Sequence, residues 1–64
     1  MQARAEFTII EDGKRKDINL PTRNLHISRE DAYPAGDLVY IRAGSRIYLS
    51  AEDYETTLRH IVED

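Results

Sequence analysis

The chain has 64 residues, enough for a single domain (residues 1–64), and a formal net charge of −3. Its composition, 41% hydrophobic and 33% charged, argues against a disordered tail. No stretch free of Asp, Glu, Lys and Arg exceeds five residues, so no membrane-spanning segment is expected. The lack of cysteine excludes a disulfide framework and favours a reducing, cytoplasmic location.

The first part of the chain predicts a β-hairpin. Apolar side chains recur through residues 4–11 in the manner of a strand, and Asp12-Gly13 follows. This dipeptide favours a two-residue turn, because both central residues of a type I′ turn need a positive φ. The return strand is expected at residues 14–20 and ends at Pro21, which has no amide hydrogen to donate to a sheet.

Residues 22–37 show the least regular pattern. Leu25–Ile27 fit either a short strand or a buried loop, and Ser28–Asp31 has the composition of a helix cap and first turn. Pro34 and Gly36 would end such a helix within about one turn. The segment is interpreted either as a connector between two hairpins or as a recognition loop, and its length is unusual for a plain connector.

A second hairpin is predicted for residues 38–49. Residues 38–41 are all strand formers, the loop is expected at 43–45, and the chain returns through 46–49. Side chains on a strand alternate between the two faces of the sheet. One face is expected to hold Val39, Ile41, Ile47 and Leu49, and the opposite face Tyr40, Arg42, Arg46 and Tyr48.

A helix is predicted at the C-terminal end, with Ser50 as its N-cap and Asp53 in the place of the capping-box acid. Leu49 and Tyr54 occupy the positions of a hydrophobic staple. The acidic residues near the expected first turn suit the helix dipole. The apolar residues then recur every three or four positions, which gives a single stripe: Ala51, Tyr54, Leu58, Ile61 and Val62.

The expected architecture is α+β, with two antiparallel hairpins (ββ-loop-ββ) and one C-terminal helix packed on the sheet. A small β-barrel with a terminal helix is compatible with the same pattern. The strand order and the oligomeric state do not follow from the sequence. The expected core consists of Phe7, Ile9, Ile18, Leu20, Leu25, Ile27, Val39, Ile41, Ile47, Leu49, Tyr54, Leu58 and Ile61.

The residue types that enzymes use for catalysis or cofactor binding are present, but their spacing predicts neither a catalytic site nor a cofactor site. The two histidines, His26 and His60, lack the further ligands that a zinc site needs. Ser28 stands near a histidine and two acids, but residues of one short loop rarely form a catalytic triad. The paired acids lie in expected turns, caps and ends, where water keeps them ionised. The three glycines are isolated, so no phosphate-binding loop is expected.

A protein-interaction module is the interpretation that remains. Tyrosine and arginine are enriched at binding hot spots, and an acidic helix can meet a basic groove. The candidate partner-binding residues are Tyr33, Tyr40, Arg42, Arg46, Tyr48, Glu52 and Glu55. An ordinary solvated sheet face and a solubilising helix are the structural alternatives for the same residues. Self-association through this sheet face or an unpaired strand edge, giving a homodimer, is a close variant.

The specific form of this hypothesis rests on a class-level analogy, because small acidic chains without cysteine or a pocket often regulate larger enzymes. It describes a phage- or mobile-element-type regulator or inhibitor that docks on a nucleic-acid-processing enzyme. The alternative is a small nucleic-acid-binding protein that uses Lys14, Arg15 and Lys16 together with the tyrosine–arginine strand face. The net negative charge opposes that alternative.

Overall fold

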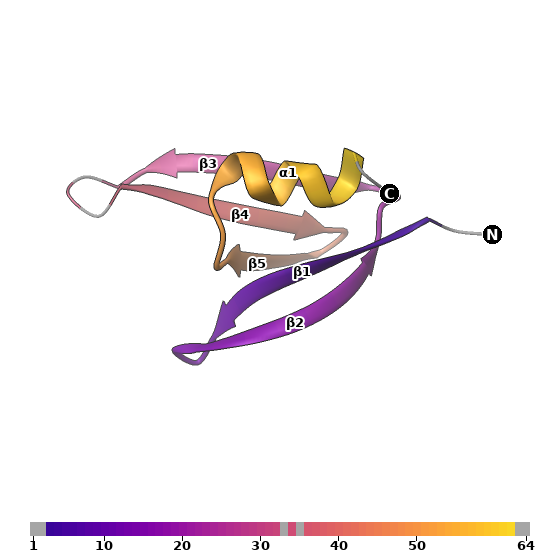
Figure 1. Ribbon diagram of the computed structural model, residues 1–64, viewed down its shortest axis with the longest axis horizontal. Helices are drawn as coiled ribbons and strands as arrows, with labels where there is room; N and C mark the ends of the chain where they lie inside the picture. The colour runs from indigo at the N-terminus through magenta and orange to yellow at the C-terminus, as the bar shows by residue number, and fades with distance from the viewer. Residues whose placement is uncertain (1–2, 33, 35, 63–64) are drawn as a thin grey trace.

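The computed structural model describes residues 3–32, 34 and 36–62. Its elements are β1 (Arg4–Glu11), β2 (Lys14–Pro21), β3 (Leu25–Asp31), β4 (Asp37–Ala43), β5 (Arg46–Ser50) and α1 (Tyr54–Val62). The strands form one five-stranded antiparallel sheet in the order β2-β1-β5-β4-β3, and α1 packs on it (Figure 1). The predicted α+β class with a C-terminal helix is therefore confirmed. Within the described residues, no helix is long and apolar enough to cross a membrane.

The first hairpin forms as its turn residues predict. Asp12 and Gly13 both take a positive φ, 54° and 75°, between the paired residues Glu11 and Lys14. These values match the two central positions of a type I′ turn. Pro21 is the last residue of β2, where its missing amide hydrogen costs the sheet little.

The structure corrects the prediction for residues 22–37. Residues 25–31 form the strand β3, which pairs with β4 without a break from Leu25 opposite Ala43 to Asp31 opposite Asp37. The helical turn predicted at Ser28–Asp31 is wrong, and so is the single long connector. The backbone pairing with β4 outweighs the local preference of these polar residues for a cap, because strand propensity depends strongly on context.

The sheet is strongly curved. Its two edge strands, β2 and β3, are joined by residues 22–24 alone, and Asn24 takes the left-handed φ of 58° that this tight link requires. The four Cα steps from Pro21 to Leu25 span at most about 14 Å. The opposite edges therefore approach each other at this end (Figure 1). They do not pair, so the sheet is open and the small-barrel alternative is not the architecture.

The core lies on the side of the sheet that α1 covers. Phe7, Ile9 and Ile41 are at most 1% exposed, and α1 packs against β1 and β3 above them. Further buried or partly buried side chains complete this cluster: Ala5, Ile18, Leu20, Leu25, Ile27, Tyr48 and Ile61. The prediction is wrong for two core residues, Ile47 and Leu49. Ile47 is 65% exposed, and both residues lie on the face of the sheet away from α1.

The length of the second hairpin's turn explains this difference. The turn contains two residues, Gly44 and Ser45, so that Ala43 pairs with Arg46 and Ile41 lies opposite Tyr48. Directly opposed residues share a face of the sheet. The predicted three-residue loop at 43–45 would shift the register by one residue, and such a shift exchanges the faces of the whole return strand.

The two isoleucines of this hairpin should respond very differently to truncation. Ile41→Ala removes a fully buried side chain and is expected to lower the free energy of unfolding by roughly 2–5 kcal/mol. Ile47→Ala removes an exposed one and should cost less than about 0.5 kcal/mol. Urea unfolding followed by circular dichroism measures both. Equal losses would contradict the observed register.

Candidate functional site

The face of the sheet away from α1 carries an exposed apolar surface. Cross-strand pairs place Ile10 next to Leu49, Leu49 next to Tyr40, and Ile47 next to Arg42. Ile47 is 65% exposed and Ile10 is 39% exposed, while Tyr40 and Leu49 are half-buried. These five residues, from β1, β5 and β4, are called the Ile47 surface below.

An open hollow of about 350 Å³ adjoins the Ile47 surface. Its lining combines aliphatic, aromatic and charged side chains, namely Ser28, Glu30, Tyr40, Arg42 and Ile47. The carboxylate of Glu30 gives this hollow a negatively charged hydrogen-bond acceptor, and the guanidinium of Arg42 gives it a positively charged donor. The mixture of an apolar surface and flanking charges is typical of protein-binding sites.

The structure separates the four residues that were predicted to share this face. Tyr40 and Arg42 lie on it, but Arg46 and Tyr48 lie on the side of α1. Tyr48 packs against the core cluster, and the Arg46 guanidinium carbon stands 5.7 Å from the centre of its ring. The predicted tyrosine–arginine face is therefore wrong as a single surface, because the two-residue turn shifts the return strand.

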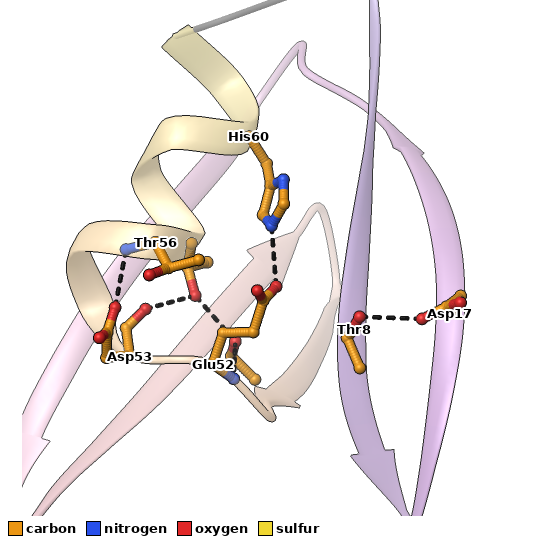
Figure 2. A network of polar contacts seen from close by, with 8 residues as sticks. Thr8, Asp17, Glu52, Asp53, Thr56 and His60 are labelled. Atoms are coloured by element: carbon orange, nitrogen blue, oxygen red, sulfur yellow. Dashed lines mark hydrogen bonds and ion pairs between the residues drawn. The ribbon is translucent and has the colours of Figure 1, made fainter.

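Glu52, a candidate partner-binding residue, is held inside the protein's own structure. Its carboxylate Oε1 lies 2.8 Å from Nε2 of His60, as Figure 2 shows. The His60 ring also packs edge-on against Phe7, with centroids 5.8 Å apart and planes at 82°. The pair therefore fastens the last part of α1 to the segment before it. Glu55 is exposed near the start of α1, and Tyr33 lies outside the described residues.

Asp53, rather than Ser50, is the N-cap of α1. Its Oδ1 accepts the backbone N–H of Thr56 at 2.8 Å (Figure 2). The hydrogen bond from this backbone N–H holds the pKa of Asp53 below its ordinary value, and a side-chain hydrogen bond with Thr56 and the charge of Arg59 act in the same direction. The predicted capping box and staple are not formed, because the helix begins at Tyr54 and not directly after Ser50.

Ser50 instead joins a chain of hydrogen bonds beneath the helix. The Glu52 backbone N–H donates to Ser50 Oγ at 3.1 Å, and Thr57 Oγ1 donates to the Asp53 carbonyl at 2.7 Å. The 2.9 Å contact between the two hydroxyls therefore has Ser50 as its donor. Thr57 is fully buried and Ser50 is 8% exposed, so this chain satisfies polar groups that water cannot reach.

A second hollow, of about 410 Å³, lies between the first turn of α1 and strands β3 and β4. Arg29 dominates it, since its guanidinium stands 5.0 Å from the centre of the Tyr54 ring and 3.9 Å from the Asp37 carboxylate. Asp53 and Glu55 also line this hollow. In the described part of the chain, no three His, Cys, Asp or Glu side chains are grouped so that they could hold a metal ion.

The basic run does not form a patch on one face. Lys14, Arg15 and Lys16 are consecutive on β2, so Arg15 lies beside Ile10 while Lys16 lies beside Ile9 on the opposite face. Lys16 also contacts the Glu11 carboxylate at 3.6 Å. The three cations are exposed, but their charge is divided between two sides of an edge strand.

Comparisons with protein-family models, with curated proteins and with solved structures give no match. The surfaces of the molecule are therefore the basis for inferring its function. Sequence reasoning placed Ile47 and Leu49 in the core and did not single out Ile10. The signal that identifies Ile47 and Leu49 is Gly44, which takes the positive φ of 62° that the first position of a two-residue type II′ turn requires.

The cap gives stability a defined pH dependence. Because the folded-state pKa of Asp53 is lowered, its stabilisation is complete above the usual aspartate pKa of about 3.9 and is lost as the pH falls through the lowered folded-state pKa. Asp53→Asn keeps an N-cap oxygen and removes the titration. The loss of stability in acid, measured by thermal unfolding, should therefore be smaller in Asp53→Asn. An identical acid dependence would contradict this role.

The buried hydroxyl chain should be costly to interrupt. Thr57→Val preserves the side-chain shape but leaves the Ser50 hydroxyl without its acceptor, and is expected to cost about 1–3 kcal/mol of unfolding free energy. Adding Ser50→Ala should recover part of that loss, because the orphaned donor is removed. Denaturant unfolding of the single and double variants measures the effect. A neutral Thr57→Val would show that the chain contributes nothing.

Proposed function

We propose that this chain is a protein-interaction module without catalytic activity, which binds a protein partner through the Ile47 surface. The observation that supports the proposal is the 65% exposure of Ile47 on the face that α1 leaves open. Isolated exposed aliphatic residues are common, but here Ile47 adjoins Ile10, Leu49 and Tyr40 in a contiguous group. Contiguous exposed apolar patches mark interaction sites.

The surface also indicates the chemistry of the partner. Ile47 and the ring of Tyr40 offer apolar contact area, and Arg42 offers a guanidinium suited to a carboxylate. The hollow between them is open and shallow enough to receive a protruding side chain rather than to enclose a small molecule. The partner is therefore proposed to present an apolar side chain with an acidic residue beside it.

In its finer form, the proposal is a cytoplasmic regulator or inhibitor, of the phage or mobile-element type, that docks on a nucleic-acid-processing enzyme. The net charge of −3 suits the basic surroundings of a nucleic-acid groove. Direct binding of nucleic acid receives less support, because Lys14, Arg15 and Lys16 are divided between two faces. The experiment below therefore also measures the binding of nucleic acid.

Arg42 and Arg46 provide a matched pair for the experiment. Both are exposed arginines beside the same turn, but they lie on opposite faces of the sheet. In affinity capture from a host lysate with quantitative mass spectrometry, Arg42→Glu and Ile47→Asp should each lower recovery of the specific partner about tenfold or more. Arg46→Glu should retain it. Circular dichroism verifies that each variant is folded.

Four outcomes contradict the proposal. Wild-type protein that recovers no partner, or a partner retained by both surface variants, removes the Ile47 surface as the binding site. Equal loss with Arg46→Glu points to a general charge effect. Binding of mixed oligonucleotides that weakens steeply with added salt supports the nucleic-acid alternative instead.

A further inference from the structure

The two edges of the sheet differ in how well they are protected against pairing with another strand. On β2, the consecutive charges of Lys14–Asp17 and the terminal Pro21 are both devices that blunt an edge. On β3, residues 25–31 contain no proline or glycine, their charges are confined to Arg29, Glu30 and Asp31 at one end, and they pair with β4 without a bulge. β3 ends the strand order, so its outer backbone edge has no strand partner within the described residues.

We propose that β3 pairs antiparallel with β3 of a second copy of this chain, so that two five-stranded sheets continue into one. This inference goes beyond the proposed function, because it rests on the strand edge and not on the Ile47 surface. Edge-to-edge pairing of sheets is a common route to symmetric association. α1 packs against β1 and β3 and lies along β3 in Figure 1, and no further strand pairs with β3 in the sheet.

The length of β3 fixes the register of this pairing. Ser28 is the middle residue of Leu25–Asp31, so only a two-fold axis at Ser28 pairs all seven residues. In that register His26 of each copy lies opposite Glu30 of the other. Both side chains are exposed on the face away from α1, next to Arg42 and Leu38 respectively. Neither makes a side-chain hydrogen bond or ion pair to another described residue.

The pairing of His26 with Glu30 is chemically favourable, and the two-fold symmetry produces it twice. An imidazole N–H of His26 donates to the Glu30 carboxylate of the second copy, and hydrogen-bonded cross-strand side chains stabilise a sheet. A two-fold axis normal to the sheet also keeps both helices on one side. The two Ile47 surfaces then lie on the same face of the dimer, beside the joined β3 strands. A partner with two matching sites would bind such a dimer more tightly than a monomer.

The test replaces the side chains at the two opposed positions with charged ones. His26→Glu sets two carboxylates opposite each other, and Glu30→Lys replaces the acceptor of the imidazole N–H with an ammonium group. Each single variant should weaken dimerisation by about tenfold, because both symmetric contacts lose their attraction. The double variant His26→Glu/Glu30→Lys sets a carboxylate opposite an ammonium group and should restore the dimer. Sedimentation equilibrium between about 1 μM and 1 mM covers the range expected for so small an interface.

Further measurements make the outcome decisive. Amide hydrogen exchange of β3 should slow as the wild-type concentration rises, and it should not do so in the single variants. Ile47→Asp should dimerise like the wild type, which separates this inference from the proposed partner-binding function. A wild type that stays monomeric throughout the range overturns the proposal. So does a dimer that the single variants leave intact, or one that the double variant fails to restore.

Discussion

The two-residue turn between β4 and β5 determines which side chains the molecule buries and which it exposes. Gly44 adopts a positive φ, and Ala43 consequently pairs with Arg46. Ile41, the most deeply buried residue of the second hairpin, then lies opposite Tyr48 rather than Ile47. Because the side-chain period of a strand is two residues, this pairing fixes the facing of the whole of β5.

As a consequence, the polar-headed side chains of β5 lie on the core face and its aliphatic side chains lie on the open face. Tyr48 is amphipathic, so it can contribute its ring to the core while Arg46 stacks over it at the boundary with water. Ile47 has no polar group with which to meet solvent, yet it is the residue left outside. The fold thus places a large apolar side chain where it gains nothing for the monomer's stability. The proposed binding of a partner at the Ile47 surface would give that placement a physical reason.

Local signals in the sequence were sufficient for the parts of the fold that depend on neighbouring residues. Asp12-Gly13 predicted the first turn, and the apolar stripe predicted the helix. A short strand at Leu25–Ile27 was one of two predicted alternatives, but its continuation to Asp31 was missed. This polar half becomes a strand only by pairing with β4, a partner that local composition does not reveal. Half of the candidate site was predicted correctly, because Tyr40 and Arg42 lie on the open face. Arg46 and Tyr48 do not lie there, because the turn is one residue shorter than the predicted loop.

The attachment of α1 explains why one face of the sheet is reserved for the core. A helix of nine residues is marginal by itself, so its position depends on tertiary contacts. Asp53 caps its first turn, the Ser50–Thr57 hydroxyl pair fixes it from beneath, and His60 with Glu52 fastens its last part. With the helix held at both ends, the face beneath it stays covered. Any macromolecule that binds the broad surface of this sheet therefore meets the side of Ile47, Tyr40 and Arg42.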